Sequence, residues 1–168
     1  MQGKVPEMRV SYSGQAYSPS GDKGRFALPP LFRKAVKEAS GGNRILCLDK
    51  HPKWKCLVGF GLNREEELQQ QLDREYDAAL NSGRDFDYDE RSSQLFGFEK
   101  IPFDDSGRFV MPAFLTKVGN VDDGLFFRGG GRFFTIWNPV ELGRMSDEWE
   151  AAKAACDVLV AEHEAKRK

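Results

Sequence analysis

Two arginines stand in matching surroundings, and both could take part in nucleic-acid binding. Arg25 and Arg108 each follow a glycine and precede a phenylalanine, in segments rich in turn-forming residues. The planar guanidinium of arginine can grip a phosphate or donate two hydrogen bonds to the edge of a guanine. Lys23 places a second cation beside Arg25. The sequence therefore predicts that these segments contact DNA.

The two arginines belong to an internal repeat. Residues 18–32 align with residues 101–115, and each copy reads Gly-Arg-Phe, a small or apolar residue, a large apolar residue and proline. This number of matching positions is greater than chance would give. We therefore interpret the chain as two half-domains that build one core between them. The aligned pairs are Arg25 with Arg108, Pro29 with Pro112, Leu31 with Phe114, and Phe32 with Leu115.

Each copy of the repeat is predicted to form a turn, a short strand, a proline stop and a short helix. Asp104 and Gly107 favour a turn, because an acidic side chain can accept hydrogen bonds from nearby amides and glycine allows a positive φ. Asp22 and Gly24 take these roles in the first copy. Pro112 cannot donate to a sheet, so it ends the strand and can begin a helix.

Two interpretations of Arg108 stay open. It can contact DNA, as we expect of Arg25, or it can pair with Asp104 and lock its own turn. The residue four positions before Arg25 is Gly21, so no carboxylate at that place neutralises Arg25. We therefore expect Lys23 and Arg25 to matter most for binding.

The repeated motif of Asp, three residues and Arg, with Gly before the Arg and an apolar run and Pro after it, resembles that of the MraZ family. The second copy, from Asp104 to Arg108, fits the motif in full, whereas Gly21 replaces the acid in the first. Tyr12-Ser-Gly14 is similar to the family's aromatic-x-Gly start, and Phe134-Thr-Ile-Trp137 to its "EIW" strand. The resemblance covers most of residues 12–144.

The resemblance implies an α+β fold, mostly β, in which two AbrB-like swapped-hairpin halves form one intramolecular barrel with flanking helices. It also implies a transcriptional regulator acting on the promoter of the division and cell-wall gene cluster, including its own gene. Its partners would be double-stranded DNA, at short repeated promoter boxes, and further copies of itself in a ring-shaped homo-oligomer. We divide the chain into a first half (10–62), an acidic helix and linker (63–93), a second half (94–144) and a C-terminal helix (145–168).

The charge distribution agrees with a DNA-binding surface, although the net charge is only −1. Residues 1–60 carry eleven Lys and Arg against four Asp and Glu, whereas residues 61–93 carry four against ten. A segregated basic half can supply the footprint that phosphate binding requires. Arg9 and Arg33 in this half are further DNA-binding candidates. The alternative is a solvated surface whose asymmetry arose by chance.

Periodicity and turn residues predict the other elements. Asn63 followed by Glu66 resembles a capping box at the start of an amphipathic helix whose apolar positions recur every four residues. Ser146 is the expected cap of a last helix, in which Trp149 should pack on the barrel or on a neighbouring subunit. The remaining expectations are strands at 9–17, 44–48, 55–60, 93–98, 124–128 and 132–137, a helix at 30–39 and a linker at 81–91.

Catalysis, a metal site and a membrane span are not indicated. Cys47, His51 and Cys56 lack the paired spacing of a zinc site, so we expect no metal or cofactor. The adjacent acids Asp104-Asp105 and Asp122-Asp123 suit turns better than general acid–base work, so we expect no enzyme. Gly129-Gly-Gly131 suits a tight hairpin better than a phosphate loop. No run is long and apolar enough for a bilayer, and no secretory signal is visible.

Three cysteines suggest a reducing compartment, so we expect a cytoplasmic, nucleoid-associated protein. Two other functions remain open. The chain could be an AbrB-like antitoxin, which would also wrap a toxin with a disordered tail, or a non-catalytic assembly or scaffold protein whose arginine turns are structural. The helical pattern at the C-terminus counts against the antitoxin.

Overall fold

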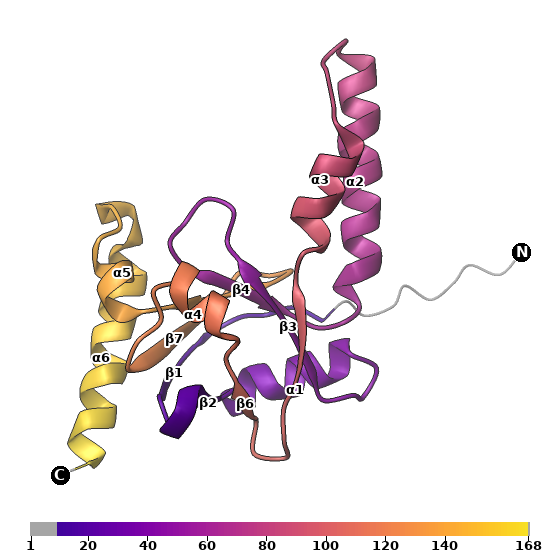
Figure 1. Cartoon of the computed structure of the whole chain (residues 1–168). Coiled ribbons are helices and arrows are strands. Elements are labelled where there is room, and N and C mark those ends of the chain that lie inside the picture. Colours follow the sequence, from indigo (N-terminus) through magenta and orange to yellow (C-terminus); the bar gives the residue numbers. More distant parts are fainter. Residues whose placement is uncertain (1–9, 168) are drawn as a thin grey trace, which may run out of the picture.

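A computed structural model of the chain describes residues 10–167. It is an α+β structure, which confirms the predicted class, with one six-stranded antiparallel sheet, a separate two-stranded sheet and surrounding helices (Figure 1). The strands are β1 (Gln15–Pro19), β2 (Arg25–Ala27), β3 (Ile45–Lys50), β4 (Leu57–Phe60), β5 (Glu99–Pro102), β6 (Arg108–Val110), β7 (Gly124–Gly129) and β8 (Phe134–Trp137).

Equivalent strands of the two halves occupy symmetric places in the large sheet. Its order is β1-β7-β8-β4-β3-β5, and the hairpins β3–β4 and β7–β8 meet where β4 pairs with β8. The first strand of each half lies beside the hairpin of the other half, because β1 pairs with β7 and β5 pairs with β3. Neither half therefore completes a sheet by itself.

The aligned strands of the repeat form the small sheet. β2 runs antiparallel to β6, and Phe26 stands opposite Phe109 at its centre. Both rings are buried, with centroids 6.3 Å apart. The expected barrel is not confirmed: the strand pairings within residues 10–167 give an open sheet with β1 and β5 at its edges.

Aromatic side chains fill the core between the large sheet and α1 (Pro30–Ala39). Phe32 of α1 packs against Phe134 and Phe127, at centroid distances of 5.0 and 5.8 Å. Tyr12 lies 5.1 Å from Phe134, and its hydroxyl accepts a hydrogen bond from the amide of Gly61. In the second half α4 (Ala113–Val118) follows β6 as α1 follows β2.

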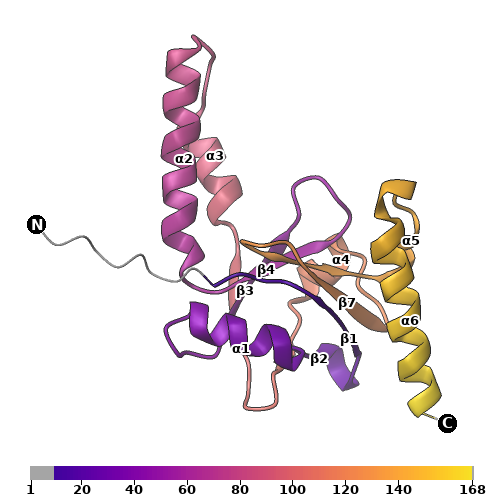
Figure 2. The same cartoon turned by 180° about the vertical axis from the view of Figure 1, so that it is seen from behind.

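The segment between the halves forms a helical arm that rises from the sheet on the side away from α1 (Figures 1 and 2). It consists of α2 (Arg64–Asn81) and α3 (Tyr88–Phe96). Arg91 of α3 makes a two-bonded ion pair with Glu75 of α2, with N–O distances of 2.7 and 3.1 Å. The pair joins the two helices.

Three expectations for this segment were wrong. Residues 88–96 are helical, so the linker is shorter than predicted and the strand expected at 93–98 begins only at Glu99. The side chain of Asp87 caps α3 by accepting a hydrogen bond from the amide of Glu90 at 3.0 Å. The predicted capping box is also absent, because Asn63 has helical backbone angles and makes no side-chain cap bond.

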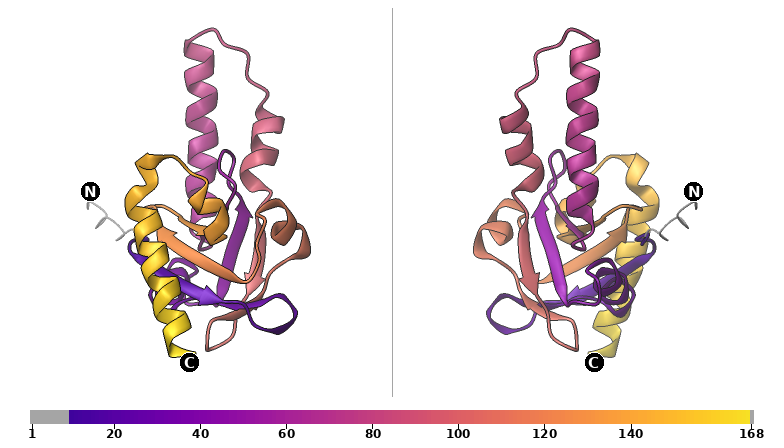
Figure 3. Two further views of the ribbon diagram at one scale, coloured as in Figure 1. Left: turned by 90° about the vertical axis from the view of Figure 1, so that its left-hand side faces the viewer. Right: turned by 90° about the vertical axis from the view of Figure 1, so that its right-hand side faces the viewer.

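The C-terminal segment covers the edge of the large sheet that is formed by β1. Figure 3 shows α6 (Glu150–Lys166) running beside β1, after the short helix α5 (Pro139–Gly143). Trp149 packs against Trp54 and Trp137 at centroid distances of 4.6 and 5.2 Å, so it contacts the sheet of its own chain. Ser146 makes no side-chain cap bond. Within residues 10–167, no helix combines the length and the apolar composition that a bilayer crossing requires.

Candidate nucleic-acid interface

The two turns of the repeat close with the same backbone hydrogen bond. The first turn (residues 20–24) closes with the amide of Gly21 donating to the carbonyl of Arg25 at 2.7 Å. The second turn (residues 103–107) closes in the same way between Asp104 and Arg108 at 3.0 Å. Gly24 and Gly107 have φ of 72° and 82°, which favours glycine at both places.

The small sheet holds both arginines on its outer face. Phe26 and Phe109 point into the core, so their neighbours Arg25 and Arg108 point outward and are exposed. Arg25 stands opposite Val110, and Arg108 opposite Ala27. The fold thus brings the two predicted arginines to one two-stranded ribbon at the surface.

In the second turn, Asp104 holds the arginine. One carboxylate oxygen of Asp104 accepts hydrogen bonds from the amides of Ser106 and Arg108, at 3.0 and 2.9 Å. The other accepts from Nε of Arg108 at 2.9 Å. The backbone amide of Arg108, followed by its side chain and the amide of Ser106, lowers the pKa of Asp104. The structure thus contains the pairing that the sequence left open as one interpretation of Arg108.

The first turn has no equivalent of this lock. Arg25 is exposed, and within residues 10–167 its side chain makes no hydrogen bond or ion pair. Gly21 stands at the place of Asp104. Asp22 is exposed and makes no side-chain hydrogen bond in the described part of the chain, so it does not replace the missing acid. Lys23 has φ of 58° and is also exposed.

Comparison with known proteins gives the family of this chain. It is 31% identical over 121 residues to the transcriptional regulator MraZ of Rhodospirillum rubrum, which covers 71% of this chain and 74% of that protein. The chain belongs to the MraZ family. It is also 32% identical over 130 residues to the MraZ of Parvibaculum lavamentivorans, covering 77% of this chain and 76% of that protein. No protein-family model matches the chain.

A third similar protein is the MraZ of Methylococcus capsulatus, 30% identical over 129 residues, with 76% of this chain and 79% of that protein covered. These relatives are named as transcriptional regulators, which is a non-enzymatic role. The MraZ resemblance that the repeated motif predicted is therefore confirmed, and the similarity spans most of the described structure.

Arg33 has a structural task that the MraZ motif does not reveal. Its Nε and Nη2 both donate to the carbonyl of Leu28 at 3.2 Å, and its Nη1 donates to the carbonyl of Asp105 at 3.5 Å. The guanidinium lies over Gly107, where a Cβ atom would come within 2.5 Å of Nε. Arg33 therefore braces the second turn from α1. This packing joins residues far apart in sequence, so only the fold could show it.

The remaining residues that the sequence analysis singled out are Arg9 and the rejected metal candidates Cys47, His51 and Cys56. Arg9 lies outside the described residues. Cys47 and Cys56 are buried, and burial raises the pKa of each thiol to about 12. Nδ1 of His51 accepts hydrogen bonds from the amides of Lys53 and Trp54, and burial lowers the pKa of His51. These three residues make ordinary packing and turn contacts.

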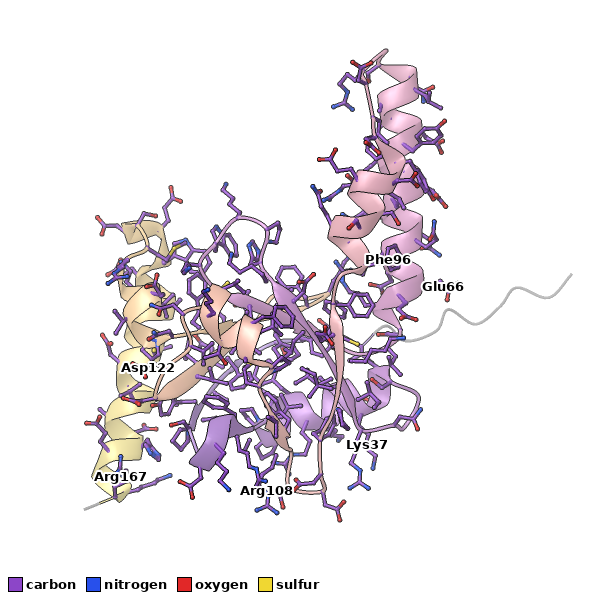
Figure 4. The ribbon with its side chains drawn as sticks, in the orientation of Figure 1. Lys37, Glu66, Phe96, Arg108, Asp122 and Arg167 are labelled. Carbon is purple, nitrogen blue, oxygen red and sulfur yellow. The ribbon has the colours of Figure 1, made fainter. Side chains whose placement is uncertain are left out.

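Figure 4 shows how charge divides over the molecule. Lys37 of α1 and Arg108 lie at the side of the structure that carries the repeat turns, whereas Glu66 lies on the arm above the sheet. The first turn of α2 contains three glutamates. The acidic start of the arm therefore lies away from the arginine ribbon.

Proposed function

We propose that this MraZ-family chain is a sequence-specific DNA-binding transcriptional regulator that uses the arginine ribbon as its contact surface. The observation that carries the proposal is the exposed pair Arg25 and Arg108 on the outer face of β2 and β6, in a family whose relatives are named as transcriptional regulators. Arg25 and Lys23 supply cations with no intramolecular partner among the described residues, so they can reach bases or phosphates.

The DNA target that the family resemblance implies belongs to the same proposal. It is a set of short repeated boxes in the promoter of the division and cell-wall gene cluster, including the chain's own gene. The regulator would act in the cytoplasm at the nucleoid. A ring-shaped homo-oligomer would present one arginine ribbon per subunit, which suits a target made of repeated boxes.

We also propose that the halves correspond to the family's swapped hairpins. The exchange of first strands between halves supports this, because β1 pairs with β7 and β5 with β3. The proposed units are 10–62, 63–93, 94–144 and 145–168, where the second unit contains most of the helical arm. The barrel closed by these halves remains part of the resemblance and lacks a counterpart in the strand pairings of residues 10–167.

The alternatives have less support. An AbrB-like antitoxin would need a disordered tail to wrap a toxin, but residues 150–166 form α6. An assembly or scaffold protein would use both arginines in structural pairs, whereas Arg25 makes none among the described residues.

A gel-shift experiment tests the proposal. The purified chain is titrated onto its own upstream region and onto a scrambled duplex of the same length, at several salt concentrations. We expect tighter binding to the upstream region at every salt concentration, with affinity for both duplexes falling as salt rises. Equal affinity for the two duplexes would contradict sequence-specific regulation.

A further inference from the structure

A basic hollow lies beside the second turn, between α1 and the start of β3. It is lined by Pro30 at the beginning of α1 and by Phe103 of the second turn, among others. Four cationic side chains and one carboxylate surround it, so its charge is strongly positive. The residues that line this basic hollow are Pro30, Arg33, Lys34, Lys37, Arg44, Phe103 and Asp105.

Three of the four cations in the basic hollow have no acidic partner within residues 10–167, and one of them, Arg33, donates only to backbone carbonyls. Arg44 pairs with Asp105, the only carboxylate among the lining residues. Lys34 and Lys37 are exposed on α1 and form no ion pair within residues 10–167. Positions 34 and 37 are three apart, so both side chains leave α1 on one face. An anion entering the hollow would meet two uncompensated ammonium groups.

Arg33 gives the basic hollow a donor that is already in position. Its bonds to the carbonyls of Leu28 and Asp105 use three of its five N–H groups and fix the plane of the guanidinium. Two N–H groups remain for a ligand. A fixed guanidinium loses little side-chain entropy on binding, which suits it to a phosphate oxygen.

The repeat supplies an internal comparison. The positions of the second copy that correspond to Arg33, Lys34 and Lys37 hold Thr116 and Lys117 of α4 and Asn120, which follows that helix. The half-domain therefore folds with a single cation on this helix. Arg33 braces the second turn, whereas Lys34 and Lys37 make no ion pair within residues 10–167, so these two lysines point to a ligand.

The cations that line a second hollow already have hydrogen-bond or ion-pair partners. The space between the arm and the β3–β4 turn is lined by Lys50, Arg64 and Arg91, among others. Lys50 donates to two backbone carbonyls at 2.6 Å, Arg64 pairs with Glu67, and Arg91 pairs with Glu75. An anion there would have to break these bonds, which it need not do at Lys34 and Lys37.

We propose that the basic hollow binds a backbone phosphate of the DNA that the arginine ribbon contacts. The inference rests on the proposed function and adds a division of labour between the turns. Arg108 is held by Asp104 beside a phosphate-binding hollow, so the second turn positions the duplex. Arg25 is unpaired in the described structure, so the first turn reads the base sequence of the duplex. Phosphate contacts fix register but carry no sequence information.

The salt dependence of DNA binding tests the hollow. The variant Lys34→Gln/Lys37→Gln removes both free cations, and Lys53→Gln/Lys55→Gln removes the same charge from the exposed β3–β4 turn. Affinity for box-containing and scrambled DNA is measured from low to moderate salt. Each lost phosphate contact lowers the slope of log affinity against log salt by about 0.9. We expect the first variant to lose about one to two units of slope and to weaken both duplexes alike.

The control variant is expected to keep the parent slope. The phosphate assignment is overturned if both double variants show the parent slope, or if both lose slope equally, because a general charge effect would then suffice. A loss confined to box DNA would also overturn it. If the Lys34/Lys37 variant keeps its slope while Arg25→Ala loses specific binding, the hollow fails and the proposed function stands. If the parent protein binds no DNA, both the phosphate assignment and the proposed function are wrong.

A second experiment tests whether the ligand of the basic hollow is DNA or free phosphate. The melting temperature of the parent protein is recorded with inorganic phosphate and with chloride at matched ionic strength. We expect no difference at millimolar concentration, because one hollow offers a single phosphate few contacts without the rest of the duplex. Saturable stabilisation by inorganic phosphate, lost in the Lys34→Gln/Lys37→Gln variant and accompanied by an unchanged DNA slope, would assign the hollow to a small anion instead.

Discussion

The two turns of the repeat differ in the residue that stands four positions before the arginine. Gly21 and Asp104 occupy matching places, with matching backbone hydrogen bonds, yet only Asp104 supplies a carboxylate. That carboxylate accepts two backbone amides and the Nε of Arg108. The difference leaves Arg25 unpaired among the described residues, so we propose different tasks for the two arginines, although each stands in the sequence Gly-Arg-Phe.

Gly21→Asp is expected to install the missing lock. The φ of Gly21 is −99°, which any residue adopts, and a Cβ atom there would lie 3.3 Å from the carbonyl oxygen and 3.9 Å from the Cβ of Arg25. We expect a higher free energy of unfolding than for Gly21→Ala, which adds Cβ without a carboxylate. Urea denaturation across pH measures both variants.

The pH dependence of this gain follows from Asp104, whose pKa is lowered by its amide and guanidinium partners. An aspartate with a lowered folded pKa stabilises the protein above its unfolded pKa of about 4 and loses that effect as pH falls through the folded value. The advantage of Gly21→Asp over Gly21→Ala should therefore be present at neutral pH and vanish in acid. An advantage that persists at low pH would contradict the lock.

The sequence showed part of this site. The motif located both arginines and the absence of an acid at residue 21, because these depend on neighbours in the chain. It missed the contacts of Arg33 and Arg44 with Asp105, because those contacts join the two halves. The basic hollow could be found only after the fold had brought α1 to the second turn.

At the scale of elements, the pairing of β4 with β8 joins the two halves of the large sheet. Gly59 of β4 stands opposite Phe134 of β8, and a Cβ atom at Gly59 would come within 2.5 Å of the Phe134 ring. This close approach holds the central strands against the core.

Gly59→Ala is expected to lower the free energy of unfolding by about 1–3 kcal/mol, because the buried ring of Phe134 must move. Gly143→Ala is the matched control: nothing lies within 4 Å of its Cβ position, so it should be neutral or slightly stabilising. Urea denaturation compares the two. A Gly59→Ala protein as stable as the control would show that the central pair tolerates a wider spacing.

Element prediction succeeded where a local signal decided the structure and failed where packing did. The repeat strands, α1 and the β7–β8 hairpin followed from alternation, proline and glycine. Phe96 and Phe98 alternate as in a strand, but Asp87 caps a helix there and Arg91 pairs with Glu75 on the neighbouring helix. The cap was visible in the sequence, whereas the docking on α2 was not.

For the whole molecule, the exchange of strands makes the halves depend on each other. Residues 1–90 alone lack β5, β6, β7 and β8, the partners of β3, β2, β1 and β4. We expect this fragment to be aggregated or poorly folded, with no cooperative thermal transition by circular dichroism. A soluble monomeric fragment that melts cooperatively would show that one half contains a complete core.

The purified chain is expected to be a closed homo-oligomer. Leu31 and Phe114 are aligned in the repeat, and both are about half exposed, at 54% and 49%. The two halves thus present equivalent apolar positions that neighbouring subunits can cover. Light scattering at micromolar concentration measures the mass. A monomer of 19.0 kDa would contradict the assembly.

The central claim is that Arg25 reads DNA sequence. The most direct measurement is the affinity of the parent, Arg25→Ala and Arg74→Ala for promoter boxes and scrambled DNA, at two salt concentrations. Arg74 is an exposed arginine on the acidic arm, so its removal changes the charge equally. Losing a base contact costs about 1–3 kcal/mol, or about ten- to a hundredfold in affinity. We predict such a loss for Arg25→Ala on the boxes, a smaller loss on scrambled DNA, and parental binding for Arg74→Ala. A folded, oligomeric Arg25→Ala protein that binds both duplexes like the parent would show that the first turn is structural.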